Sequence, residues 1–158
     1  MRSITDIYGK KHKVGCLGCD LRIGKLSGAG VVLSSKYFEV EQDTEIPIPG
    51  FMILSSKRHL ISVDDFTKAE QIDFVGTLVK VRQAMRKVLK IKVVYFFQNE
   101  DTDSHFHVWI FPRYQWMNKF GKKIQSVRPI MEYARRKLKT KKNLAEVEKS
   151  RLKLKKIL

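Results

Sequence analysis

The segment SHFHVWIFPR, residues 104–113, constrains the fold more than any other part of the sequence. Side chains on a β-strand alternate between its two faces. One face of this segment is wholly apolar and carries Phe106, Val108 and Ile110. The opposite face carries His105, His107 and Trp109. We therefore predict a strand from His105 to Phe111, stopped by Pro112, whose apolar face packs against a helix.

The two imidazoles on one face of this strand are candidates for chemistry, since the whole chain has only four histidines. A neutral imidazole nitrogen is available at cellular pH and can attack phosphorus to form a phospho-histidine. Such an attack needs one tautomer held in place and donors around the phosphate oxygens. Candidate donors are Ser104, Arg113 and the backbone amides from Asn99 to Ser104. The alternative is that both histidines are hydrogen-bonded and structural.

The remaining pattern indicates an α+β fold with an antiparallel sheet of about five strands. Four further strands are predicted over residues 30–33, 37–42, 51–54 and 92–98. A long helix is predicted over residues 67–89, where Thr67 and Glu70 match a capping box. Its apolar stripe comprises Ile72, Val75, Leu78, Val79, Met85 and Leu89. This helix is expected to cover one face of the sheet.

Both ends of the chain differ in character from this central part. Residues 1–30 are polar and rich in glycine, which favours a loop or a short helix. Residues 127–139 and 143–157 are predicted to be helical, the second with Asn143 and Glu146 as a cap pair. We therefore predict a domain over residues 1–125 and a basic helical extension over residues 126–158.

Most of the net charge of +16 lies near the C-terminus. Residues 119–158 hold 15 Lys and Arg against 3 Asp and Glu, a net charge of +12. Such a segment attracts polyanions, so nucleic acid is a candidate partner. A solvated basic helix that only aids solubility is the equally simple alternative.

Two cysteines, Cys16 and Cys19, stand in a C-x-x-C spacing. The spacing suits half of a zinc site or a redox motif. The redox reading is the weaker one, because no βαβ pattern surrounds the pair.

The sequence shows no apolar run of about 18 residues and no apolar N-terminal leader, so neither a membrane span nor a secretory signal is predicted. We expect a cytoplasmic protein with no membrane partner. That reducing compartment does not favour a structural disulfide, which leaves both thiols free to bind a metal.

The strand segment resembles the signature of the histidine triad (HIT) family, in which His-x-His-x-His precedes apolar residues and often Pro-Arg. His105 and His107 match the first two histidines, and Trp109 stands where the third belongs. The stretch from Asp43 to His59 resembles the family's upstream block of an acidic residue, a Pro-rich turn, an apolar strand and a basic pair before a histidine. The resemblance covers residues 16–113.

The resemblance implies a ligand set and a ribose contact that spacing alone does not. Zinc-containing members use a C-x-x-C, the histidine after the basic pair and the first triad histidine. The implied structural zinc ligands are Cys16, Cys19, His59 and His105, a chemically reasonable set. Asp43 stands where family members bind the ribose hydroxyls.

The resemblance also implies an activity: hydrolysis or transfer at the α-phosphorus of an adenine- or guanine-type nucleotide. His107 would be the nucleophile, no catalytic metal would be needed, and the protein would be a homodimer. Substrates would be dinucleoside polyphosphates, phosphoramidates or adenylylated molecules. Trp109 departs from the pattern, because an indole nitrogen donates a hydrogen bond but does not accept or deliver a proton. The alternative is a non-catalytic nucleotide- or nucleic-acid-binding protein in which Trp109 contacts the nucleotide.

Overall fold

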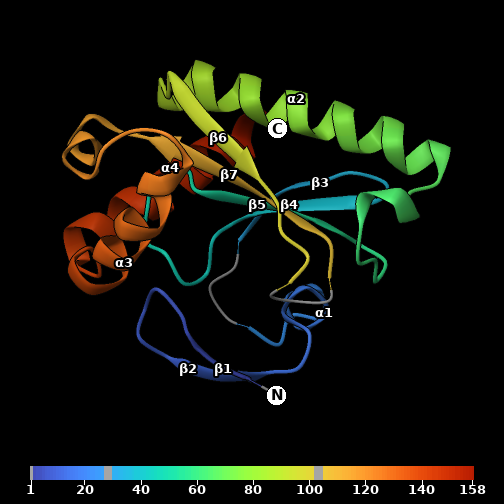
Figure 1. Cartoon of the computed structure of the whole chain (residues 1–158), viewed down its shortest axis with the longest axis horizontal. Helices are drawn as coiled ribbons and strands as arrows, with labels where there is room; N and C mark the ends of the chain where they lie inside the picture. The colour runs from blue at the N-terminus through green and yellow to red at the C-terminus, as the bar shows by residue number, and fades with distance from the viewer. Residues whose placement is uncertain (1, 27–29, 102–104) are drawn as a thin grey trace.

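The computed structural model describes residues 2–26, 30–101 and 105–158. Its elements, shown in Figure 1, are β1 Arg2–Thr5, β2 Lys11–Val14, α1 Leu17–Arg22, β3 Val31–Ser34, β4 Phe38–Gln42, β5 Met52–Ser56, η1 Val63–Asp65, α2 Lys68–Leu89, β6 Val93–Phe97, β7 His107–Arg113, η2 Gln115–Phe120, η3 Ile124–Ser126, α3 Val127–Lys137 and α4 Lys141–Ile157. None of the helices in these described ranges is long and apolar enough to cross a membrane.

Five strands form an antiparallel sheet in the order β3-β4-β5-β7-β6, which confirms the α+β prediction. The two central strands, β5 and β7, pair from Met52 opposite Ile110 to Ser55 opposite His107. Figure 1 shows α2 along one side of the sheet and the N-terminal elements on the other side. A central strand has both faces available, so β7 can contribute to a core on one face and a site on the other.

Strand β7 confirms the predicted alternation, but it begins at His107 rather than His105 and does not stop at Phe111. Val108 and Ile110 are buried in the core, while His107 and Trp109 face the opposite side. The strand continues through Pro112 to Arg113. Pairing with β5 has ended by then, and Pro112 is opposite Val94 of β6 only. A proline without an N–H is tolerated where one side of the strand has no partner.

Helix α2 begins where the sequence indicates. The Thr67 side chain accepts the backbone N–H of Glu70 at 3.3 Å, and the Glu70 carboxylate accepts the backbone N–H of Thr67 at 2.7 Å. The buried face differs from the prediction, because Ile72, Val75 and Val79 are exposed. Leu78, Met85 and Leu89 of the predicted stripe do pack in the core, where Phe74 and Val81 join them.

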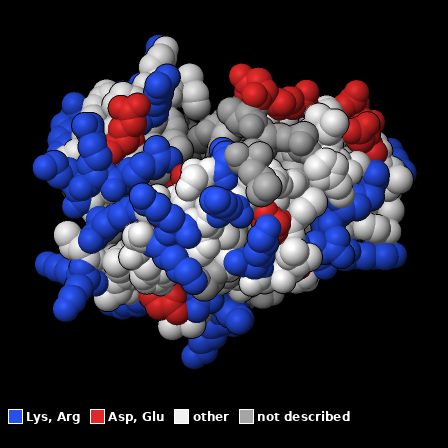
Figure 2. Space-filling model, turned by 90° about the horizontal axis from the view of Figure 1, so that it is seen from below, with Lys and Arg blue, Asp and Glu red and all other residues white. Residues whose placement is uncertain are grey.

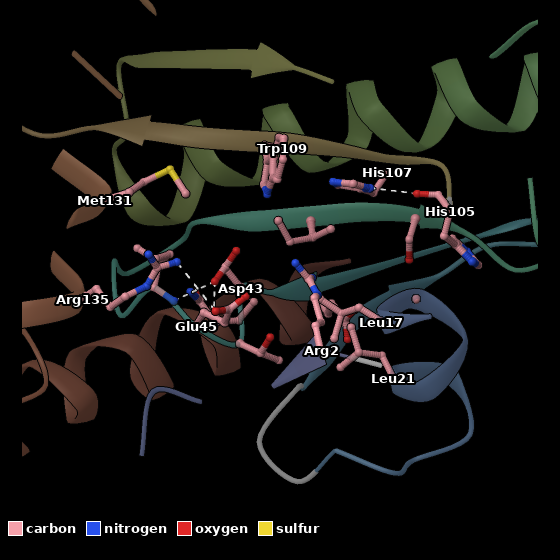
Figure 3. Close-up of a pocket in the computed structure, with 17 residues that line it drawn as sticks. Arg2, Leu17, Leu21, Asp43, Glu45, His105, His107, Trp109, Met131 and Arg135 are labelled. Carbon is pink, nitrogen blue, oxygen red and sulfur yellow. Dashed lines mark hydrogen bonds and ion pairs between the residues drawn. The ribbon is translucent and has the colours of Figure 1, made fainter. Parts of the chain in front are cut away.

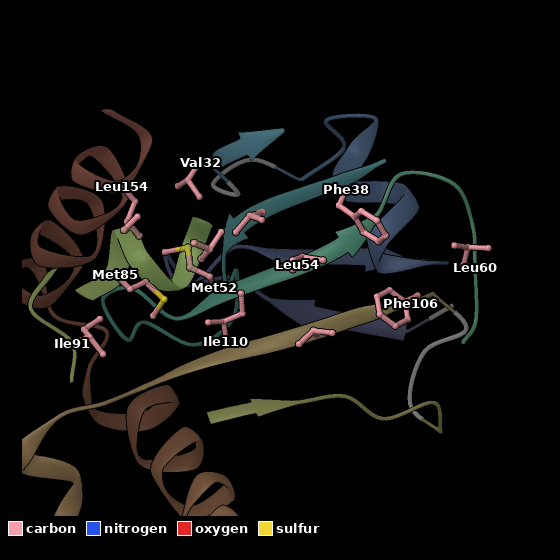
Figure 4. Packing of buried hydrophobic residues seen from close by; sticks show 14 of the residues in the cluster. Val32, Phe38, Met52, Leu54, Leu60, Met85, Ile91, Phe106, Ile110 and Leu154 are labelled. Atoms are coloured by element: carbon pink, nitrogen blue, oxygen red, sulfur yellow. The ribbon is translucent and has the colours of Figure 1, made fainter. Parts of the chain in front are cut away.

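The main core lies between α2 and the sheet (Figure 4). It includes a group of aromatic rings in which Phe106 lies 4.7 Å from Phe66 and 5.6 Å from Phe74 between ring centroids. Phe106 is 1% exposed, so its truncation to alanine should cost about 3–5 kcal/mol of folding free energy. This rigid packing holds the backbone from which β7 starts.

The N-terminal region is more regular than predicted. Residues expected to form a loop or a short helix form the β1–β2 hairpin followed by α1. The Asp6 carboxylate accepts the backbone N–H groups of Tyr8 and Lys10 at 2.9 Å each, and Gly9 adopts a φ of +87°. These turn contacts make a hairpin from strands of four residues, which are too short to show a clear period.

The C-terminal helices pack on the same body as the sheet. Helix α4 lies against α2 and β3, and its Leu154 is fully buried in the main core. Ile130 and Ala134 of α3 are buried on the opposite face of the sheet. The helix α4 is capped by Thr140 rather than by Asn143, whose side chain donates to the Pro47 carbonyl at 2.6 Å. The predicted boundary near residue 125 stays a prediction.

Candidate nucleotide site and metal centre

A cavity of about 210 Å³ lies on the face of the sheet opposite α2. Figure 3 shows its lining, with Trp109 and His107 of β7 on one side and α1 residues Leu17 and Leu21 facing them. Helix α3 closes the far end with Met131 and Arg135 (Figure 3). The sheet therefore forms the floor of the cavity, and two separate coverings, α3 and the N-terminal elements, form its walls.

The His107 ring is held in one tautomer by the backbone. Its Nδ1 lies 2.9 Å from the carbonyl oxygen of His105, and a carbonyl only accepts, so Nδ1 carries the proton and donates. In the neutral ring the other nitrogen, Nε2, carries the lone pair, and it has no hydrogen-bond partner among the described residues. His107 is only half-buried and lines the cavity, so Nε2 is accessible to a ligand.

Trp109 lies beside His107 and limits its movement. The two rings meet edge to face, with centroids 4.5 Å apart and planes at 89°. Phe97 of β6 contacts the other side of the indole, with ring centroids 5.0 Å apart. Trp109 therefore both lines the cavity and packs against the buried cluster on this face of the sheet, which includes Ile130 and Ala134 of α3.

Asp43 lies in the cavity wall just after β4. Its Oδ1 accepts the backbone N–H groups of Glu45 at 2.8 Å and Ile46 at 2.7 Å. Burial raises the pKa of the Asp43 carboxyl to about 7, against the opposing effect of these two hydrogen bonds. Its second oxygen, Oδ2, has no partner in the described part of the chain and remains available to a hydroxyl donor.

Four predicted metal ligands, Cys16, Cys19, His59 and His105, meet beside this cavity. Their ligand atoms all lie within 4.8 Å of one another. Cys16 Sγ lies 3.6 Å from His59 Nδ1 and 3.3 Å from His105 Nδ1, and Cys19 Sγ lies 3.4 and 3.5 Å from the same two nitrogens. Tetrahedral zinc with ordinary bond lengths would separate sulfur from nitrogen by about 3.6 Å. The cluster therefore has the composition and spacing of a structural Cys₂His₂ zinc site.

The surroundings of His105 fit the same role. Its Nε2 donates to the Ser56 carbonyl at 2.8 Å, which leaves the Nδ1 lone pair directed at the two sulfurs. Burial lowers the pKa of His105 and so favours the neutral, metal-binding form. Gly18 allows the close approach, because a Cβ built there would lie 2.6 Å from His105 Cδ2.

The metal cluster and the cavity share one short piece of backbone. The His105 side chain belongs to the cluster, and the His105 carbonyl accepts the proton-bearing nitrogen of His107. Anything that holds His105 in place therefore also orients the His107 ring. This coupling follows from their separation of two residues at the start of β7.

Two of the remaining predicted phosphate ligands, Asn99 and Arg113, lie outside the cavity. Ser104 lies outside the described residues. Asn99 follows β6, and its side chain donates to Asp101 rather than lining the cavity. Arg113 is at the other end of β7, where its guanidinium donates to Ser126 Oγ at 3.0 Å and to the Gly121 carbonyl at 2.8 Å.

The sequence did not reveal several residues that line the cavity. They include Arg2 of the hairpin, Leu17 and Leu21 of α1, Glu41 of β4, and Met131 and Arg135 of α3. Met131 and Arg135 are four residues apart, so they share a helix face. No local sequence pattern predicts that this face of α3 packs on the sheet, because the contact is between elements far apart in the chain.

No protein-family model and no curated protein matches the chain. Solved structures do match it. A HIT-like protein involved in cell-cycle regulation from Bartonella henselae has a TM-score of 0.66 at 16% identity, over 93% of this chain and 98% of its own. A Zn-bound histidine triad family protein from Mycobacterium smegmatis has a TM-score of 0.62 at 16% identity, over 90% and 94%. A HIT family member from Bacillus subtilis has a TM-score of 0.60 at 19% identity, over 89% and 96%. The chain therefore has the fold of histidine triad proteins.

Proposed function

We propose that this chain, which has the histidine triad fold, binds a nucleotide and hydrolyses or transfers it at the α-phosphorus through His107. The observation that carries the proposal is the His107 tautomer: Nδ1 donates to the His105 carbonyl at 2.9 Å, and Nε2 is free beside the cavity. An imidazole fixed in this way is a neutral nucleophile with a defined direction of attack.

The proposed reaction changes no oxidation state, so it needs no oxidant or reductant. His107 Nε2 donates its lone pair to the α-phosphorus, and the bond from phosphorus to the leaving-group oxygen or nitrogen breaks with its electron pair. A water molecule or another acceptor then attacks phosphorus and loses its proton to solvent, and the bond between phosphorus and Nε2 breaks to restore the imidazole. Asp43 would accept a ribose hydroxyl through its free oxygen. Asn99 and Arg113 have no part in this proposal, because neither lines the cavity.

Trp109 points to substrates with good leaving groups. Its indole N–H can donate a hydrogen bond but cannot supply a proton to an amine or an alkoxide. A pyrophosphate or polyphosphate leaves as a stable anion and needs no such proton. We therefore expect dinucleoside polyphosphates to be turned over faster than phosphoramidates with basic amine leaving groups.

The cluster of Cys16, Cys19, His59 and His105 would hold the zinc ion. When bound, zinc supplies a structural link between α1 and the start of β7, and it takes no part in the phosphorus chemistry. Metal analysis of the purified protein should give one zinc per chain, and Cys19→Ser should lower that content.

The test of catalysis is a search for the covalent intermediate. The protein is incubated with an adenine or guanine dinucleoside polyphosphate, quenched at alkaline pH to protect the P–N bond, and analysed by peptide mass spectrometry. A nucleotidyl group on His107 supports the proposal. His107→Asn should abolish both adduct and turnover but keep nucleotide binding, while His12→Asn, a matched change at a distant histidine, should keep both. No adduct and no turnover in the original chain would refute catalysis.

A second candidate function is binding of nucleic acid without catalysis, and the surface charge favours it. Figure 2 shows one face of the molecule, on which Lys and Arg side chains gather at the end where α3 lies in Figure 1. Exposed examples are Arg136, Lys137, Lys141 and Lys142. Binding driven by these groups should weaken steeply with salt. Affinity for a single-stranded oligonucleotide that does not change between low and high salt would exclude this candidate.

A homodimer is also part of the proposal. Strand β6 is an edge of the sheet and exposes Val93 and Phe96. Helix α2 exposes Ile72, Val75 and Val79. An exposed edge and apolar side chains of this kind favour pairing with a second copy. Sedimentation of the original chain as a dimer, and of Val75→Glu as a monomer, would support this arrangement; a monomeric original chain would refute it.

A further inference from the structure

Glu41 is a buried acid that the proposed chemistry leaves without a role. It lies in β4, next to the buried core residue Val40, so its side chain faces away from the core and toward the cavity. It is 5% exposed and lines the cavity. Its carboxyl makes no hydrogen bond or ion pair within the described ranges of the chain.

A carboxyl in this position is costly to the fold. Removing a charged group from water without a partner is unfavourable, and the group avoids part of that cost by holding its proton. Burial, with the negative charges of Glu39 and Asp43 nearby, raises the pKa of Glu41 to about 8. Because the Glu41 carboxyl has no partner within the described ranges of the chain, we expect a bound ligand to supply one.

The sheet register places Glu41 well away from the reacting phosphorus. Glu41 is opposite Ile53, which is opposite Trp109, and His107 lies in the adjacent row opposite Ser55. Two strand spacings separate β4 from β7, which is about 10 Å across the sheet. A nucleotide with its phosphorus at His107 Nε2 can therefore extend across the sheet toward Glu41.

The surroundings of Glu41 suit a flat base. Leu17 and Leu21 of α1 line the same cavity and supply an apolar surface on which a purine ring can pack. Asp43, the proposed ribose ligand, follows Glu41 by two residues. Phosphate, ribose and base would then have separate contacts at His107, Asp43 and Glu41.

We propose that Glu41 contacts the base and selects guanine over adenine. This inference rests on the proposed function, since it needs the cavity to be a nucleotide site. Guanine presents the N1–H and the 2-amino N–H side by side, and the two oxygens of a carboxylate accept both. Adenine offers an acceptor, N1, beside its 6-amino group, so it clashes electrostatically with the same carboxylate.

The preference for guanine comes from the ionised form of Glu41. A protonated carboxyl has one donor and one acceptor, which match either O6 and N1–H of guanine or N1 and the 6-amino group of adenine. A carboxylate matches guanine alone. Guanine can therefore use both forms of Glu41, whereas adenine can use one, and two-point recognition of a base discriminates by about 10- to 100-fold.

The test compares binding of GMP, IMP and AMP to the full chain by calorimetry at pH 8. We expect GMP to bind about 10- to 100-fold more tightly than AMP, with IMP, which lacks the 2-amino group, between them. Glu41→Gln should reduce the preference to a few-fold at most. Glu39→Gln, on the same strand but outside the cavity, should keep it. Folding of each variant is checked by its Tm.

The outcomes separate the two proposals. Equal affinity of the original chain for GMP and AMP, or an unchanged preference in a folded Glu41→Gln variant, would overturn the role of Glu41 and leave the nucleotide site standing. Failure of all three nucleotides to bind the original chain would overturn the proposed function itself.

Discussion

Replacing Gly18 with alanine should damage the metal cluster, although it adds a single methyl group. A Cβ at this position would lie 2.6 Å from Cδ2 and 2.7 Å from Cγ of the His105 ring. The ring would have to withdraw by about 0.8 Å to reach ordinary van der Waals separation. It is 3% exposed and bonded through Nε2 to the Ser56 carbonyl, so it has no space into which to move.

The substitution should affect both folding stability and zinc affinity, and different assays measure these two effects. Overpacking of a rigid site costs about 1–3 kcal/mol of folding free energy, partly offset by the gain of about 1 kcal/mol in helix propensity when alanine replaces glycine. The change in Tm should therefore be small. Zinc ligation tolerates displacements of only about 0.2 Å, so zinc affinity should fall by about 10- to 100-fold.

A competition assay with a chromogenic zinc chelator measures this affinity directly. Gly15→Ala is the matched control, because nothing lies within 4 Å of a Cβ built at Gly15. That variant should bind zinc like the original chain. If Gly18→Ala also kept the original zinc affinity, the inference that the His105 position depends on Gly18 would be wrong.

Three further changes test other parts of the argument. Thr67→Ala should lower the free energy of unfolding by about 1 kcal/mol through loss of the helix cap, while Thr67→Ser keeps it; equal urea midpoints for both would contradict the capping role. The hydrogen bond from Arg58 lowers the pKa of Glu70 from 4.5 to about 2. Its stabilisation is therefore present above pH 4.5 and lost as pH falls toward 2; urea titrations across this window should show a steeper loss for the original chain than for Glu70→Gln, and parallel curves would refute the linkage. Trp109→His should accelerate turnover of a phosphoramidate with an amine leaving group by about 100-fold or more by supplying a general acid; an unchanged rate, in a variant shown to be folded, would mean that proton supply does not limit the reaction.

The sequence identified features that depend on neighbouring residues. The alternation in residues 105–111 assigned the two faces of β7, and Thr67 with Glu70 located the start of α2. Both signals are local, because strand alternation and a capping box act within a few residues. The metal ligands required more than spacing: the C-x-x-C alone left zinc and redox readings open, and His59 and His105 joined it only through the family resemblance.

The tertiary structure decided which surfaces meet. Helix α2 carries apolar side chains around much of its circumference, and only its packing on the sheet shows that Phe74 is covered while Ile72 is exposed. Arg2, Met131 and Glu41 come together in one cavity from β1, α3 and β4. Their proximity depends on the strand order and on the packing of α3 and the N-terminal elements over the face of the sheet opposite α2. These are long-range contacts that no stretch of a few residues encodes. Local hydrogen bonding and periodicity thus specified the elements, and burial of apolar surface between distant elements specified the site.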